Sequence, residues 1–189
     1  MIQSSPPTDY TRHKALCEQL LHESGLEVAI LRLPAVIPID VLGVFDPIMF
    51  DVPLSDRIEF LHPWDVGLAM VNAIESEEIW RGTYLIGGGP RCQVHQRELI
   101  AKPFEALGIG ILPDEAFRAT PLHTDWLETT ESERVLQFQR FDFDDYVRDM
   151  LEFVGWRRRV IRASRPIARW KLLRTSPYYR RNSPSQTPQ

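Results

Sequence analysis

The fold is decided by residues 10–34, which read YTRHKALCEQLLHESGLEVAILRLP. Three leucines recur at helical spacing, so a helix is predicted from Thr8 to Ser24, with Gly25 at the position that ends it. The aliphatic run from Glu27 to Leu33 predicts a buried strand. A helix joined to a strand by a short turn is typical of α/β units.

The alternation of helices and strands continues along the chain. Further strands are expected at 57–61 and 83–86, and further helices at 62–76, 96–107, 130–138 and 143–156. A capping-box sequence, Thr130 to Glu133, opens the fourth of the five expected helices. Gly108 is expected to close the helix at 96–107, and Asp142 to cap the helix at 143–156. Strands that alternate with helices predict an α/β fold with a parallel sheet. Three strands are few for such a sheet, because buried parallel strands need neighbours on both sides, so the chain is expected to be incomplete.

Tyr10 and Lys14 carry the clearest chemical signal. They are four residues apart and therefore share one face of the predicted helix. A phenol has a pKa of about 10, and a nearby cation favours its ionised form, so the pair suits acid–base catalysis. The spacing alone also fits an ordinary surface helix, because such pairs occur by chance.

Four segments occur in an order that is typical of one family. They are Tyr10-x-x-x-Lys14 with residues 25–34, residues 57–69, residues 82–89 with 98–100, and residues 125–130 with 134–136. Together they resemble the extended short-chain dehydrogenases/reductases of the NAD-dependent epimerase/dehydratase kind. The resemblance implies the C-terminal part of a Rossmann-like parallel sheet plus a small α/β substrate lobe in residues 1–156. The N-terminal dinucleotide-binding half is then missing.

The resemblance also implies roles for individual residues. Tyr10 corresponds to the catalytic acid/base that exchanges a proton with a substrate hydroxyl while hydride moves to or from the nicotinamide. Lys14 corresponds to the residue that holds the nicotinamide ribose and polarises the tyrosine, and Pro34 belongs to the loop against the carboxamide. Arg57 could reach an anionic substrate group such as a diphosphate. The implied activity is epimerase, dehydratase or oxidoreductase chemistry on a sugar or nucleotide sugar.

Parts of the family pattern are absent. The loop that usually reads Val-Tyr-Gly-Pro continues here as Val36-Ile37-Pro38, which leaves the substrate open. The glycine-rich turn that seats a pyrophosphate on a helix N-terminus would lie upstream of Tyr10. NAD or NADP is therefore expected to bind the complete family fold, but not this chain tightly by itself. The chain is expected to be a fragment, a split enzyme completed by an N-terminal half or a homodimer partner, or a non-catalytic module that binds a small-molecule substrate or a partner.

Three further features are expected to be structural. Gly87-Gly88-Gly89 has neither dinucleotide nor P-loop spacing, so a strand-ending turn is predicted. His62 is expected to be a hydrogen-bonded structural histidine, and Asp65 a helix cap. The histidines show no metal-ligand spacing, and no metal site is expected. Cys17 and Cys92 are expected to be reduced, buried thiols of a cytosolic protein rather than a disulfide.

Charge is distributed unevenly along the chain. All 26 acidic residues lie at or before Glu152, whereas residues 157–181 hold ten basic residues among apolar and aromatic ones. Residues 157–189 are therefore expected to be a basic tail, with its end at 182–189 disordered. An interfacial helix on an anionic membrane fits this segment, and so does an extension that neutralises the acidic body or a partner. No nucleic acid is expected as a partner.

The expected location follows from what the composition excludes. No apolar run approaches the roughly 20 residues of a membrane-spanning helix. The first residues have neither the basic nor the apolar region of a signal peptide. A cytoplasmic protein is expected, peripheral at the membrane if the tail binds lipid.

Overall fold

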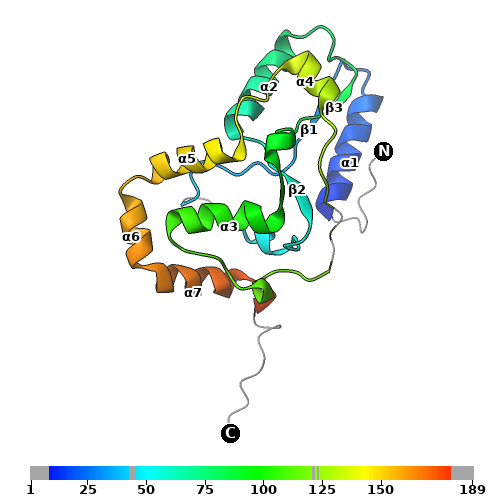
Figure 1. The fold of residues 1–189 in the computed structure, drawn as a ribbon. Helices are drawn as coiled ribbons and strands as arrows, with labels where there is room; N and C mark the ends of the chain where they lie inside the picture. Colours follow the sequence, from blue (N-terminus) through cyan, green and yellow to red (C-terminus); the bar gives the residue numbers. More distant parts are fainter. Residues whose placement is uncertain (1–8, 43–45, 121, 123, 180–189) are drawn as a thin grey trace.

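The computed structural model describes residues 9–42, 46–120, 122 and 124–179, in which two small sheets are surrounded by seven α-helices (Figure 1). The helices are α1 (Asp9–Glu23), α2 (Pro63–Glu75), α3 (Gln96–Leu107), α4 (Thr130–Leu136), α5 (Phe143–Val154), α6 (Arg157–Ala163) and α7 (Arg165–Thr175). The strands are β1 (Ile30–Arg32), β2 (Arg57–Glu59), β3 (Thr83–Leu85) and β4 (Gln93–His95). Three short 3-10 helices lie at Pro47–Phe50, Pro90–Cys92 and Asp114–Ala116. The expected α/β class is confirmed.

The first sheet consists of β1 and β3, which pair in parallel with Ile30 opposite Thr83. Helix α1 precedes β1, and the chain turns between them at Gly25, whose φ of 72° is the left-handed value that favours glycine. A bidentate ion pair from Arg32 at the end of β1 to Glu18 fixes α1 against the strand. The predicted helix, glycine turn and strand are therefore confirmed, although β1 is shorter than expected.

The second sheet differs from the prediction. Strand β2 pairs antiparallel with β4, with Arg57 opposite His95, instead of joining one continuous parallel sheet. A parallel bridge from Ala35 to Phe60 connects this region with the chain that leaves β1. Strand β4 is three residues long and runs directly into α3, so its pattern was too short to predict.

Two residues at the start of α2, His62 and Asp65, have structural roles. His62 is the N-cap, and its Nδ1 accepts a hydrogen bond from the Trp64 amide at 3.3 Å. Its structural role is confirmed. Asp65 is not the cap, contrary to the prediction. Its buried carboxylate accepts hydrogen bonds from the backbone amides of Arg140 and Phe141, and so joins α2 to the segment before α5.

Two later helices show how capping differs from the sequence pattern. The capping box predicted at Thr130 and Glu133 is wrong, because the N-cap of α4 is Thr129 and makes no side-chain cap hydrogen bond. The Glu133 carboxylate instead accepts from two amides just beyond the C-terminal end of α4. At α5, Asp142 and Asp145 form a complete capping box, so the predicted cap is confirmed.

Three groups of buried side chains hold the described residues together. One lies between β2, α3 and α5, where the Phe60 ring packs 4.8 Å from that of Tyr146 and 5.3 Å from that of Phe143. A second lies beneath α2 and β3, and a third between residues 50 and 117 and the end of α7. Both cysteines are free thiols, and Cys92 is buried, as predicted. The predicted burial of Cys17 is wrong, because it lies on α1, of which no residue is buried.

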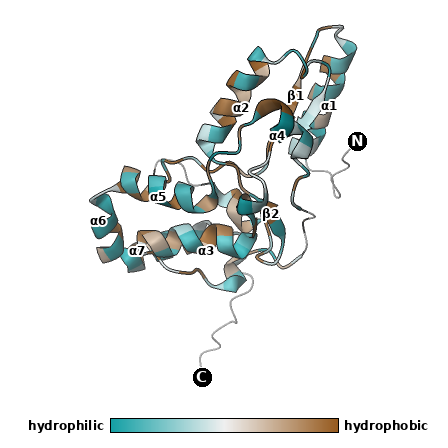
Figure 2. Cartoon of the chain, turned by 45° about the horizontal axis from the view of Figure 1, so that its top comes forward, coloured by the Kyte–Doolittle hydropathy of each residue, from teal (hydrophilic) through white to brown (hydrophobic). Residues whose placement is uncertain are grey.

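The part of the molecule that contains α1, α2 and β1 carries apolar residues that the described chain leaves exposed. No residue of α1 is buried, and its Leu16 and Leu20 are 52% and 56% exposed. On α2, Val71 and Ile74 are 53% and 76% exposed. Figure 2 shows apolar stretches in brown on α2 and on β1. Among the described residues, β1 has β3 as its one strand neighbour.

The basic segment after Trp156 forms two helices, α6 and α7, which pack on the rest of the chain. Apolar side chains of α6 and α7 contact two of the three buried groups. The division into a body that ends at residue 156 and a separate tail stays a prediction. The expected disorder at 182–189 lies outside the described residues. None of the described helices is long and apolar enough to cross a bilayer.

Candidate functional site

Tyr10 and Lys14 lie together at the N-terminal end of α1. The Lys14 Nζ is 5.5 Å from the centre of the Tyr10 ring, and the Tyr10 side chain is 69% exposed. The i, i+4 spacing thus places both groups on one face, as expected. An exposed phenol beside an ammonium can exchange protons with a molecule bound in front of it.

The fold places this pair beyond the carboxyl end of β1. Glu18 contacts Arg32 at the end of the strand. Lys14 and Tyr10 lie about one and two helical turns from Glu18, toward the N-terminus of α1. Because α1 runs opposite to β1, those turns extend past the strand's end. Figure 1 shows the N-terminal end of α1 directed toward the lobe of β2 and α3. In open α/β sheets, ligands bind outside the carboxyl ends of the strands.

Pro34 follows β1 at this same edge and is partly exposed. The next residue, Ala35, is held by two backbone hydrogen bonds, from its amide to the Glu59 carbonyl and from the Leu61 amide to its own carbonyl. The loop is therefore fixed between the two sheets. No described contact joins Pro34 to Tyr10 or Lys14.

Gly87, Gly88 and Gly89 leave β3 at the same edge, and they are packed against protein atoms. A Cβ on Gly87 would lie 2.0 Å from a carboxylate oxygen of Glu59, and one on Gly88 would lie 2.5 Å from the Phe60 carbonyl oxygen. The space beside these two glycines is therefore filled by side-chain and backbone atoms. The predicted strand-ending turn is confirmed.

Glu59 is a buried carboxylate that the sequence analysis missed. It is 1% exposed and accepts hydrogen bonds from the amides of Gly89 and Leu127 and from the side-chain amide of Gln93. These bonds join β2 to the glycine turn and to the segment before α4. Alternation along β2 could not have indicated its burial, because Arg57, two residues earlier on the same face of the strand, is exposed.

Arg57 lies at the start of β2, where its side chain is 56% exposed. Its guanidinium is 4.6 Å from the Trp126 ring and its Nη1 is 3.7 Å from Asp125 Oδ1. His95, opposite Arg57 in the sheet, packs edge-on against the same tryptophan. The guanidinium thus lies over an aromatic ring, with part of its surface open to solvent. No described contact joins Arg57 to Tyr10 or Lys14.

Burial shifts the pKa of two polar groups beneath this edge. Burial raises the pKa of Asp65 to about 6, although the Phe141 and Arg140 amides oppose the shift. Burial also lowers the pKa of His62, against the opposing charge of Asp149. The His62 ring stacks on Phe141 at 4.6 Å, so both groups support the packing between α2 and α5 rather than face solvent.

The described residues match only one end of a dinucleotide. Lys14, Tyr10 and the Pro34 loop could contact a nicotinamide and its ribose. The space beside the one run of glycines, Gly87 to Gly89, is filled by protein atoms. This turn therefore does not suit a pyrophosphate. For metals, no group of three or more His, Cys, Asp or Glu side chains with a suitable arrangement occurs within the described part of the chain.

Comparison with known proteins gives matches among solved structures alone. No protein-family model matches the chain, and no curated protein sequence matches it significantly. UDP-N-acetylglucosamine 4-epimerase from Bacillus cereus superposes with a TM-score of 0.56 and 20% identity, over 79% of this chain and 55% of that one. UDP-glucose-4-epimerase from Stenotrophomonas maltophila, with bound NAD and formylated UDP-arabinopyranose, superposes with a TM-score of 0.57 and 20% identity. The match covers 83% of this chain and 56% of that one.

A short-chain dehydrogenase/reductase superfamily protein from Agrobacterium tumefaciens, with bound NAD, gives a TM-score of 0.61 and 16% identity over 87% of this chain and 61% of that one. The chain therefore spans between 55% and 61% of the length of these three structures. At such identities the likeness establishes a fold. That fold is a partial NAD-dependent epimerase or short-chain dehydrogenase/reductase fold, as the sequence resemblance implied.

Proposed function

We propose that this chain, which has part of the fold of the short-chain dehydrogenases/reductases, supplies the acid–base pair and the substrate lobe for NAD-linked chemistry on a nucleotide sugar. The observation that carries the proposal is the Tyr10–Lys14 pair on one face of α1, beyond the carboxyl end of β1. The solved structures with the same fold include epimerases with UDP sugars and NAD bound. The class of reaction is reversible oxidation of a sugar hydroxyl.

In this proposal Tyr10 is the group that exchanges a proton with the substrate. Its exposed oxygen, as phenolate, takes the proton of a sugar hydroxyl as that carbon is oxidised, and the resulting phenol returns the proton in the reverse step. Lys14, whose Nζ lies 5.5 Å from the centre of the Tyr10 ring, donates hydrogen bonds to a ribose. A nicotinamide cofactor, when bound, accepts and returns the hydride.

Arg57 is proposed to bind the anionic part of the substrate. A guanidinium offers five donors in a planar arrangement that fits a diphosphate, and contact with the Trp126 ring, 4.6 Å away, holds it in place. The neighbouring Asp125 is exposed and 3.7 Å away, so an incoming phosphate competes with a weak surface ion pair.

We propose further that the pyrophosphate end of the cofactor is bound by residues outside the described chain. These residues belong either to an N-terminal half or to another subunit. The exposed leucines of α1 and the open edge of β1 support this proposal, because an added strand and layer would cover them. The chain alone is then inactive and binds NAD weakly. A non-catalytic module that binds only the nucleotide sugar is the alternative.

Titration calorimetry of the full chain with UDP-glucuronic acid tests the substrate assignment. We expect weak saturable binding, which Arg57→Gln weakens about ten-fold by removing charge-assisted hydrogen bonds. Arg134→Gln is the matched control, because Arg134 is an exposed arginine that also pairs with carboxylates. An absence of saturable binding, or equal weakening by both variants, would contradict the assignment.

A further inference from the structure

The surface formed by α6 and α7 has an unusual charge. Residues 157–179 contain eight basic residues and no acidic one. The ion pairs among the described residues, at N–O distances up to 4.0 Å, all lie elsewhere in the chain. These eight cations therefore form no ion pair with the described acidic residues, and their charge remains available to an external anion.

The two helices are nevertheless held firmly. Arg165 Nε donates to the Ile109 carbonyl at 3.1 Å, and Arg169 Nη1 donates to the Ile111 carbonyl at 2.6 Å. After α7, the buried Ser176 hydroxyl donates to the Ala116 carbonyl at 2.5 Å. The basic surface is thus a fixed face of the fold. Figure 1 places it on the opposite side of the molecule from α1.

The outward face of α7 combines cations with large apolar groups. Ile167, Trp170, Lys171 and Arg174 are spaced three and four residues apart and therefore share one face. Ile167 is 68% exposed and Trp170 is 58% exposed. Trp156, just before α6, is 75% exposed. A face that is both cationic and aromatic suits the boundary between water and lipid.

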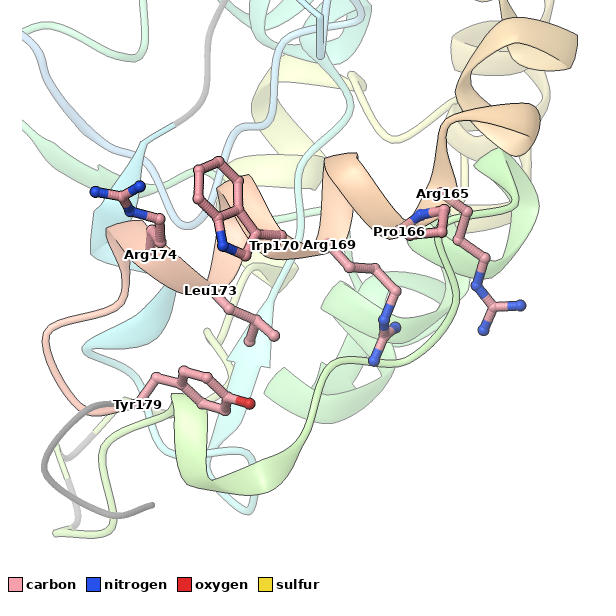
Figure 3. A pocket seen from close by; sticks show the side chains of 7 residues that line it. All are labelled: Arg165, Pro166, Arg169, Trp170, Leu173, Arg174 and Tyr179. Atoms are coloured by element: carbon pink, nitrogen blue, oxygen red, sulfur yellow. The ribbon is translucent and has the colours of Figure 1, made fainter. Parts of the chain in front are cut away.

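A hollow of about 800 Å³ opens between α7 and the residues that follow it. Figure 3 shows its lining, in which Arg165, Arg169 and Arg174 lie along α7, with Trp170 above and Tyr179 on the other side. Arg165 and Arg169 each use part of the guanidinium on backbone carbonyls and keep further N–H groups. Arg174 lies 4.6 Å from the Trp170 ring. Figure 3 shows the Arg174 guanidinium at the other end of the hollow from those of Arg165 and Arg169. The cations are therefore spread along the hollow, where each can contact an anionic phosphate group.

We propose that the α6–α7 face is a docking surface for membranes that contain anionic phospholipid. Headgroup phosphates bind in the arginine hollow, and the Trp170 and Ile167 side chains enter the interfacial layer. The positive charge attracts a negative surface, and the exposed apolar groups gain from leaving water. A polyanion without an apolar layer would use the arginines but leave the tryptophan and isoleucine in water. The site of Tyr10 faces away and stays accessible.

Vesicle flotation of the full chain tests this proposal. The probes are phosphatidylcholine vesicles with and without phosphatidylserine, at low and high salt. Binding is expected only with phosphatidylserine, and it weakens with salt. The triple variant Arg158→Gln, Arg159→Gln and Lys171→Gln removes exposed cations whose side chains make no described hydrogen bond. Each charge contributes about five-fold to partitioning, so binding should weaken about 100-fold.

The matched control is Arg81→Gln, Arg134→Gln and Arg148→Gln, which removes the same charge from the body and should leave most of the binding. Trp170→Ala should weaken binding without reducing its dependence on salt, because it removes an apolar contact. Equal flotation with both kinds of vesicle would overturn the proposal, and so would equal loss in the two triple variants. Preference for duplex DNA or RNA over the anionic vesicles would also overturn it.

Discussion

Replacing Asp65 with asparagine should change how the stability of the chain depends on pH. The Asp65 side chain is fully buried, and its carboxylate accepts from the amides of Arg140 and Phe141. Burial raises its pKa from the ordinary 3.8 to about 6, because these neutral donors do not replace the lost water. A difference of about two pH units corresponds to about 3 kcal/mol.

The sign follows from the direction of the shift. A raised pKa in the folded state means that the contribution of Asp65 to stability is fully present below pH 3.8 and is lost as the pH rises through about 6. Asparagine stays neutral at every pH. The free energy of unfolding of Asp65→Asn, minus that of the wild type, should therefore rise by about 3 kcal/mol between about pH 4 and about pH 7.

Urea unfolding followed by circular dichroism at a series of pH values measures this difference. Asp144→Asn is the control, because the Asp144 side chain is 75% exposed and exposed ion pairs contribute little. Its difference from the wild type should stay flat. The same difference in free energy of unfolding for Asp65→Asn could also stay constant between about pH 4 and about pH 7. That result would show that the buried carboxylate ionises with no loss of stability, and it would refute the reasoning.

Three further changes test the site and its support. In the chain completed by a dinucleotide-binding half, Tyr10→Phe should lower turnover about 100-fold while UDP-sugar affinity stays the same, and normal turnover would make Tyr10 a surface residue. Glu59→Gln should destabilise the chain by about 2–3 kcal/mol in urea unfolding, because its amide group faces a buried N–H donor. Gly87→Ala should lower the free energy of unfolding by about 1–3 kcal/mol, because its Cβ would meet Glu59. An unchanged unfolding midpoint for Glu59→Gln or Gly87→Ala would contradict this packing.

Local signals explain which elements the sequence could predict. The helix–glycine–strand unit around Gly25, the end of α3 at Gly108 and the cap at Asp142 each depend on a few neighbouring residues, and each is found as predicted. The pairing of β2 with β4 depends on contacts across the fold, and it was missed. Neighbouring residues therefore determine the ends of elements, whereas sheet pairing requires tertiary packing.

The candidate site shows the same division. The Tyr10–Lys14 pair follows from helical spacing, so the sequence places it correctly. Glu59 and Asp65 are buried carboxylates whose partners are backbone amides in distant segments, and nothing in their own neighbourhood indicates those partners. Trp126 stacks on Arg57 across 69 residue positions, which spacing likewise does not predict.

Titration of the full chain with nicotinamide mononucleotide, followed by NMR, tests the central claim most directly. This ligand has the nicotinamide ribose and no pyrophosphate, so it requires only the end of the site that the chain supplies. We predict weak binding that shifts the signals of Tyr10, Lys14 and Ala35 together. Lys14→Gln should abolish these shifts, and Lys102→Gln should preserve them. Unchanged Tyr10 and Lys14 signals, with or without shifts elsewhere, would contradict the assignment of this face to NAD-linked chemistry.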